Sequence, residues 1–270
     1  IGVFVRFYKC KSSDLLTGLP EHTHPAFVIN GVEQDSILLG KYKVGENGED
    51  GGALLSMPNI IPAKFTSAEQ MLSRIRVAGP NVSGMTCADY GFIKLLAQKE
   101  GWTPKGNTCW GQSHKDGATW KINESVQKGV ERTYKGYVYK CLIEHTTAEE
   151  LKPDDTPRYW EKGEFIGGVS QNNKKSDSAQ IGHCTLNGSG PLDWYLGNNP
   201  GNLVDIIGSS MEQQYGYRIF DCELQILENN NAADQNADLS SESAAWMAIL
   251  PNKNNDGYTL VPPGTAGTLH

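Results

Sequence analysis

Apolar side chains recur near the start of the chain in the pattern of short strands. Residues 1–8 gather Ile, Val, Phe and Tyr in the spacing of a buried strand. A second apolar run over 25–29 ends in Asn30-Gly31, a pair that supplies the positive φ angles of a type I′ turn. We therefore expect residues 25–29 to enter a hairpin whose partner strand is 36–42.

Two segments with helical periodicity follow, and each has its own start signal. Residues 66–69 have the spacing of a capping box, in which the Thr66 hydroxyl and the Glu69 carboxylate satisfy first-turn amides. Residues 86–89 repeat this spacing ahead of a second apolar stripe, and Gly101 stands where a C′ glycine is expected. The pattern predicts helices from about 67 to 78 and from 87 to 100.

The pattern changes between residues 121 and 164, which are rich in charges and carry their own set of aromatic side chains. Strand alternation places Tyr137 and Tyr139 on one face. A segment of about forty residues has too little interior to hide many large rings, so they form its core or a binding surface. We expect a small all-β subdomain at 121–164, inserted into a discontinuous domain made of 1–120 and 165–270.

Aromatic rings at the edge of a small sheet can stack on the apolar faces of sugar rings. We predict Tyr137 and Tyr159 as the exposed carbohydrate-binding rings, with Tyr134 and Trp160 as second choices. The alternative is that such rings, Tyr139 and Trp160 above all, simply make the core of the subdomain.

Composition and charge exclude several classes of partner. The 270 residues are 38% hydrophobic, enough for a sizeable core, and no apolar run approaches the ~18 residues of a membrane span, so no membrane insertion is expected. The net charge is −7 and the basic residues are scattered, which argues against nucleic acid as a partner. The six cysteines form no C-x-x-C pair, so free buried thiols are expected rather than zinc or a redox dithiol.

Motifs for catalysis or metal binding are missing from the sequence, and we predict no catalytic residue. There is no G-x-S-x-G, P-loop, H-E-x-x-H or G-x-G-x-x-G pattern, and His22 and His24 have no third metal ligand at a matching spacing. The Asn-rich loop 228–238 offers oxygen ligands that Ca²⁺ prefers, but it lacks the register of an EF-hand. We predict no cofactor; Ca²⁺ in this loop is the alternative to Asx side chains that bond their own backbone.

Several segments then point to a family. Residues 104–111, Pro-Lys-Gly-Asn-Thr-Cys-Trp-Gly, match a Pro-Arg/Lys-Gly-Asn-Thr/Asn-x-Tyr/Trp-Gly signature. The other matching segments, in chain order, are 24–27, 85–90, 186–194, 201–213, 216–219 and 223–226. Together they resemble phage tail and receptor-binding proteins with a C-type-lectin-like fold, which is related to that of the formylglycine-generating enzyme. The resemblance covers most of 1–118 and 180–260, and we expect local repacking at 210–214, where two tryptophans of the family pattern are replaced.

The resemblance implies an α+β fold in which two helices pack on short antiparallel strands, with the all-β insertion added. Residues 129–160 separately resemble the small chitin-binding type of carbohydrate-binding module, through Tyr139, the turn at Pro153 and Pro157, and Tyr159-Trp160. This second resemblance implies a glycan-binding accessory, and the alternative for such an insertion is a spacer.

The function implied is that of a non-catalytic bacteriophage virion protein on the surface of a tail or fibre. It would mediate host attachment by binding a glycan or protein receptor of the host surface, beside other virion proteins. A homo-oligomer is implied as well, because weak sites become useful when many copies bind one cell. Two alternatives are a purely structural tail or capsid decoration protein and an enzyme of the formylglycine-generating type, whose reactive thiols would have to be Cys184 and Cys222.

Overall fold

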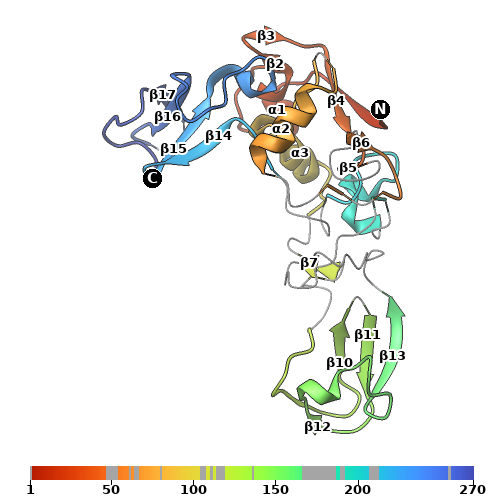
Figure 1. The fold of residues 1–270 in the computed structure, drawn as a ribbon. Coiled ribbons are helices and arrows are strands. Elements are labelled where there is room, and N and C mark those ends of the chain that lie inside the picture. The colour runs from red at the N-terminus through yellow and green to blue at the C-terminus, as the bar shows by residue number, and fades with distance from the viewer. Residues whose placement is uncertain are drawn as a thin grey trace. The chain divides into compact units, whose positions relative to one another are not determined.

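The computed structural model describes residues 2–46, 54–60, 62–63, 67–79, 81–103, 108–109, 112–113, 119–135, 137–165, 187–188, 192–206, 213–254 and 257–270. The chain folds as two compact units (Figure 1). The first unit consists of Ile1–Val5, Gly40–Lys64 and Trp102–Met211, and the second of Arg6–Leu39, Phe65–Gly101 and Glu212–His270. The predicted insertion therefore lies within the first unit.

Short helices and short strands alternate along the chain, and the fold is a mixture of helix and sheet, in agreement with the predicted α+β class. The α-helices are α1 (Ser12–Leu15), α2 (Ala68–Arg76) and α3 (Cys87–Lys99). The 3-10 helices are η1 (Pro25–Phe27), η2 (Glu149–Leu151), η3 (Leu192–Trp194), η4 (Leu196–Asn198) and η5 (Glu228–Ala233).

The strands form several small sheets instead of one large one. Two-stranded sheets pair β1 (Phe4–Tyr8) with β4 (Ser36–Gly40), β2 (Val28–Ile29) with β3 (Val32–Glu33), β5 (Val44–Glu46) with β6 (Leu54–Ser56), β7 (Thr108–Cys109) with β8 (Gln112–Ser113), and β9 (Ser125–Val126) with β12 (His145–Thr146). A three-stranded sheet has the order β10 (Glu131–Tyr134), β11 (Tyr137–Cys141), β13 (Trp160–Phe165). A four-stranded sheet has the order β14 (Tyr217–Phe220), β15 (Glu223–Leu227), β16 (Trp246–Pro251), β17 (Tyr258–Val261).

The N-terminal hairpin has the predicted turn but a different partner strand. Asn30 and Gly31 both have positive φ, 51° and 77°. A two-residue turn folds the chain back at once, so β2 pairs with the adjacent β3, while β4, predicted as its partner, pairs with β1. The prediction of 36–42 as the partner strand was therefore wrong.

The strand predicted at residues 1–8 is present as β1, but it is not buried. Its side chains alternate between exposed and half-buried positions, with Tyr8 and Phe4 on the exposed side. One face of the two-stranded sheet that β1 forms with β4 is therefore open to solvent along β1.

Both predicted helices form, and one begins a residue later than expected. The capping box of α2 is Ser67 with Gln70, and the pair predicted for it was Thr66 with Glu69. The serine hydroxyl accepts from the Gln70 N–H, and the Gln70 side chain accepts from the Ser67 N–H. The predicted box at Thr86 and Asp89 caps α3 as expected.

A cluster of aromatic rings forms the core of the second unit around α3. Phe92 meets Phe7 and Phe27 edge to face, with ring centroids 5.2 and 5.1 Å apart. The ring of His24 packs on the same Phe92 at 5.6 Å. One side chain each of β1, η1 and α3, and the residue that caps η1, therefore meet in this cluster.

Buried polar side chains hold irregular backbone together in the first unit. The Asn187 amide donates to the carbonyl oxygens of Lys43 and Met57, at 2.6 and 3.2 Å. The Asp205 carboxylate accepts from the N–H of Gly188. Asn187 and Asp205 belong to segments that carried the family resemblance. Residues 104–107, 110–111, 186, 189–191 and 207–212 of those segments lie outside the described residues.

Candidate carbohydrate site in the insertion

The insertion has its own hydrophobic core. Its buried members are Trp120, Val126, Tyr139, Cys141 and Trp160, and Val130, Tyr134, Tyr137 and Tyr159 pack partly buried around them. Thr119 also belongs here, because it forms a bridge with Thr133, whose carbonyl accepts from the Trp120 N–H at 3.0 Å. The packing of the insertion thus takes in two residues ahead of the predicted start at 121.

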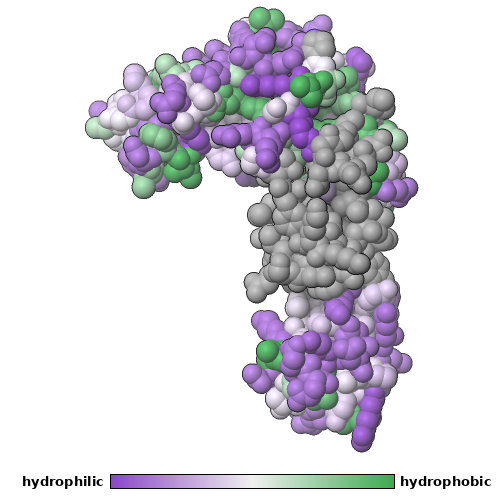
Figure 2. Space-filling model, in the orientation of Figure 1, coloured by the Kyte–Doolittle hydropathy of each residue, from purple (hydrophilic) through white to green (hydrophobic). Residues whose placement is uncertain are grey.

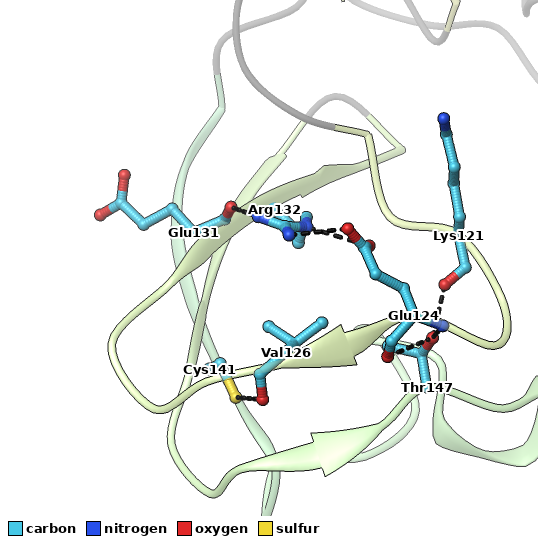
Figure 3. Close-up of polar contacts among 7 residues, drawn as sticks. All are labelled: Lys121, Glu124, Val126, Glu131, Arg132, Cys141 and Thr147. Atoms are coloured by element: carbon cyan, nitrogen blue, oxygen red, sulfur yellow. Dashed lines mark hydrogen bonds and ion pairs between the residues drawn. The ribbon is translucent and has the colours of Figure 1, made fainter.

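A polar frame fixes the first loop of the insertion to its strands (Figure 3). The Arg132 guanidinium forms a two-pronged ion pair with the Glu124 carboxylate, with Nη2–Oε1 at 2.8 Å and Nε–Oε2 at 3.1 Å. Hydrogen bonding to Arg132 lowers the pKa of Glu124. The Thr147 hydroxyl donates to the Lys121 carbonyl at 2.6 Å and accepts from the Glu124 N–H at 2.9 Å. These contacts hold the loop on which Trp120 enters the core.

The register of the central hairpin places two of the predicted rings side by side. Tyr134 lies directly opposite Tyr137 across β10 and β11, and Lys135 between them has φ of 49°, as a tight turn requires. Directly opposed residues have Cβ atoms ~5 Å apart on one face of the sheet. Tyr134 and Tyr137 therefore form a pair at the end of this hairpin, which we call the tyrosine pair.

Each ring of the tyrosine pair is half-buried, with one edge on the core and a lysine nearby. Tyr134 meets Trp120 edge to face at 5.4 Å, and Tyr137 meets Tyr139 at 6.5 Å. The ammonium group of Lys162 lies 3.5 Å from the centroid of Tyr137. Burial raises the pKa of the Tyr134 hydroxyl. A tyrosine hydroxyl is neutral at physiological pH and can donate a hydrogen bond.

Tyr159 lies at the opposite end of the sheet from the tyrosine pair. Tyr137 pairs with Phe165 and Cys141 with Trp160, so Tyr159 is about six residues along β13 from the neighbour of Tyr137. At ~3.3 Å per residue this separation is roughly 15–20 Å. Tyr159 is half-buried as well, but the structure does not bring it together with Tyr137, and the two cannot contact the same sugar ring.

His145 is the main neighbour of Tyr159. Its ring centroid lies 4.8 Å from that of Tyr159 and 5.2 Å from that of Trp160. Its Nδ1 lies 2.7 Å from the Ile143 carbonyl oxygen, and because a carbonyl only accepts, Nδ1 carries the hydrogen. Its Nε2 is buried and has no hydrogen-bond partner among the described residues. His145 therefore packs against the Tyr159 ring.

Trp160, a second choice as a carbohydrate-binding ring, is a core residue. It is 2% exposed, and its indole N–H donates to the Leu151 carbonyl at 3.2 Å. A ring without accessible faces cannot stack on a sugar, so this prediction was wrong, and the alternative that Tyr139 and Trp160 make the core is confirmed. Burial also raises the pKa of Tyr139 to about 12.

The visible surface of the insertion is mostly hydrophilic, with isolated apolar residues (Figure 2). Ile122 and Ile143 are both exposed, and neither was singled out in the sequence. Ile122 stands between two polar residues and Ile143 follows Leu142, so neither forms a periodic pattern that marks a strand or helix face.

The Asn-rich loop 228–238 satisfies its carboxylates with its own chain. Asp234 accepts from the Asn236 N–H at 2.8 Å and from the Asn30 side chain, and Asp238 accepts from the Ser240 N–H at 3.0 Å. Asn229 and Asn230 have positive φ, the conformation that Asn tolerates best after Gly. Within the described ranges, no three His, Cys, Asp or Glu side chains gather as a metal site would need. No described helix is long and apolar enough to cross a membrane.

Four of the six cysteines can be compared with the expectation of free buried thiols. Cys10, Cys87, Cys141 and Cys222 are free. Only Cys141 is buried, with its thiol donating to the Ile143 carbonyl at 3.1 Å, and Cys222 is exposed. Cys184, the other candidate thiol for a formylglycine-generating enzyme, lies outside the described residues.

Comparison with known proteins gives one distant similarity. No family model matches the chain. Over 140 residues the chain is 25% identical to Streptogrisin-C of Streptomyces griseus, an alignment that covers 52% of this chain and 29% of that protein. The chain thus spans less than a third of the length of this relative.

Proposed function

We propose that this protein is a non-catalytic virion component of a phage tail or fibre, and that its insertion binds a glycan of the host surface through the tyrosine pair. The observation that carries the proposal is the pairing of Tyr134 and Tyr137 at one end of the insertion. The resemblance of residues 129–160 to small chitin-binding modules, and of the rest of the chain to receptor-binding proteins with a lectin-like fold, supports it.

The chemistry of the tyrosine pair suits a neutral sugar with equatorial hydroxyls, because its axial C–H bonds form an apolar face. Two adjacent rings that are anchored by their edges offer apolar surface without loss of side-chain freedom on binding. The ammonium group of Lys162, 3.5 Å from the Tyr137 centroid, can donate hydrogen bonds to sugar hydroxyls. That of Lys135, 5.3 Å from the Tyr134 centroid, pairs with Asp154 at 2.6 Å and has further N–H donors for a ligand. Lys162 covers part of Tyr137, and its flexible stem lets it swing aside for a ligand.

Such a site binds weakly. An aromatic contact contributes ~0.5–1.5 kcal/mol beyond its buried area, so one site is expected to bind in the millimolar to high-micromolar range. Presentation of many copies on one particle raises the overall avidity by ~10²–10⁴. Weak individual sites are thus compatible with stable host attachment by a virion.

Co-sedimentation of the full chain with insoluble chitin and with purified bacterial peptidoglycan tests the proposal. Tyr137→Leu and Tyr134→Leu keep apolar volume against the core but remove the flat ring, so each should weaken binding by at least threefold. Tyr8→Leu, an exposed tyrosine of the second unit, is the matched control and should bind normally. Equal binding by the parent and these three variants would contradict binding by the tyrosine pair. If, in addition, Tyr159→Leu bound more weakly than the parent, the site would lie at the other end of the sheet.

The place in the virion has its own test. A cryo-electron microscopy map of the intact particle should show the chain at a tail tip or fibre end. A position in the shell or inside the tube would instead favour the alternative of a decoration or scaffold protein.

A second candidate function comes from the similarity to Streptogrisin-C, a serine protease. Among the described residues, His24 accepts from the Ala26 N–H, His22 contacts the Thr23 carbonyl, and His145 contacts the Ile143 carbonyl and the Cys141 thiol. None of these contacts involves a serine hydroxyl. Labelling of the full chain with a fluorophosphonate probe tests this candidate. A covalent adduct on a serine, together with cleavage of casein, would replace the binding proposal by proteolysis.

A further inference from the structure

The four-stranded sheet of the second unit has one face made only of uncharged, mostly apolar side chains. The register pairs Tyr217 with Ile226, Ile226 with Met247 and Ile249 with Leu260, so these side chains share one face. The members of this face, in strand order, are Tyr217, Ile219, Leu224, Ile226, Met247, Ile249, Pro251, Tyr258 and Leu260. We call it the open face.

The opposite face of the same sheet is covered within the unit over the two central strands, while Phe220 in the edge strand β14 is 46% exposed. Leu227, Trp246 and Ala248 are buried there. Polar side chains are buried on that face too: Gln225 accepts from Arg218 at 2.8 Å and donates to Glu223 at 2.8 Å. The Thr268 hydroxyl and the Gly264 N–H complete the coordination of the Glu223 carboxylate. The C-terminal segment therefore packs on this side and leaves the other without cover.

Every member of the open face is exposed or partly exposed. Ile219 is 72% exposed, Tyr258 62% and Tyr217 44%, and the other six are partly buried. Apolar surface on this sheet is visible in Figure 2. An antiparallel sheet normally turns its apolar face inward and its polar face to water, so the distribution found here indicates that a further surface covers the open face.

The area of the open face can be compared with what an interface requires. With ~150–250 Å² for a large side chain, the three most exposed members leave roughly 300 Å² in contact with water. The six partly buried members bring the total to roughly 500 Å², within the ~300–600 Å² of the largest apolar patch on a typical monomer, a patch that is often functional. Two such faces together bury ~1,000 Å², the lower limit for a specific interface.

We propose that the open face binds the open face of a second copy of this chain, as a two-fold symmetric, sheet-on-sheet dimer. The face has no charged member, so its partner must also be apolar and flat. A second copy supplies such a surface by itself, and in a two-fold interface the same patch serves both partners. Sheets pack face to face ~10 Å apart with interdigitated side chains, which suits rows of Ile, Leu and Tyr. This proposal does not depend on glycan binding by the insertion.

Sedimentation of the full chain between about 1 and 500 μM tests the dimer. The parent protein should change from monomer to dimer across this range, as expected for an interface at the lower size limit. Ile219→Asp places a charge on the most exposed member of the open face, in its edge strand β14, and should raise the dissociation constant at least tenfold. Val77→Asp, on an 82% exposed valine outside the open face, is the matched control and should dimerise like the parent.

If Ile219→Asp folds poorly, a measurement on the parent protein alone still tests the dimer. Hydroxyl-radical footprinting of the parent should show Tyr217 and Tyr258 losing reactivity as the dimer forms, while Tyr8 stays reactive. A parent that remains monomeric at 500 μM overturns the proposal. A dimer that Ile219→Asp leaves intact, or in which Tyr217 and Tyr258 keep full reactivity, overturns it as well, because the contact then lies elsewhere.

Discussion

Protonation of His24 should destabilise the second unit as the pH falls from about 6.5 to 4. The ring is 5% exposed, packs on Phe92, and accepts a hydrogen bond on Nδ1 from the Ala26 N–H at 3.2 Å. Burial, with a smaller contribution from the nearby His22, lowers the pKa of His24 from 6.5 to about 4. A proton on Nδ1 would also replace the acceptor that caps η1.

The sign and size of the effect follow from the two pKa values. Above pH 6.5 the ring is neutral in both the folded and the unfolded state, so it contributes no pH dependence. Between pH 6.5 and 4 only the unfolded state takes up the proton, and the free energy of unfolding falls. A difference of about 2.5 pKa units at ~1.4 kcal/mol per unit gives a loss of ~3 kcal/mol.

The variant His24→Asn isolates this contribution. The asparagine oxygen can accept from the Ala26 N–H in place of Nδ1, but it does not titrate. Urea unfolding of both proteins at several pH values between 7 and 4 gives two stability curves. Carboxylates contribute equally to both, so the difference between the curves should change by about 3 kcal/mol over this range. A difference that stays constant with pH would refute the account of a buried neutral His24.

Two further substitutions test the packing and the backbone of the two units. Trp160→Ala should destabilise the insertion by ~3–5 kcal/mol, because it empties the centre of its core. Unfolding followed by the near-ultraviolet circular dichroism of the insertion measures this loss. A change below 1 kcal/mol would contradict the assignment of Trp160 to the core. Cys222→Gly should stabilise the second unit by ~1 kcal/mol, since Asp221 and Cys222 have φ of 48° and 66° in a two-residue turn that favours Asp-Gly. Thermal unfolding compares it with Cys222→Ala, which removes the thiol but keeps the strained φ; equal melting temperatures would show that the backbone is not the cause.

Helix caps and turns were predictable from the sequence where a single local interaction decides the backbone conformation. Thr86 and Asp89 cap α3 as their spacing indicates, and Asn30-Gly31 turns the chain as expected. At 66–70 two overlapping capping boxes compete, and the choice of Ser67 depends on contacts that the spacing does not express.

Pairings over longer distances were less predictable. The alternation in β11 showed that Tyr137 and Tyr139 share a face, and the small size of the segment suggested Tyr139 for its core, but neither showed that Trp120 completes that core. The separation of Tyr159 from Tyr137 depends on the register between β11 and β13, which the sequence does not reveal. The open face could not be predicted from the sequence for a similar reason. Its members come from four strands whose order and register are set by tertiary packing.

Chemical-shift mapping on the isotope-labelled full chain tests the central claim most directly. Oligomers of N-acetylglucosamine are titrated to about 10 mM while the backbone amide signals are followed. The account predicts saturable shifts that cluster at Tyr134, Lys135, Tyr137 and Lys162, with little change around Tyr159. Shifts confined to the second unit, or none at 10 mM for chitin and peptidoglycan fragments alike, would contradict glycan binding by the tyrosine pair and favour the insertion as a spacer.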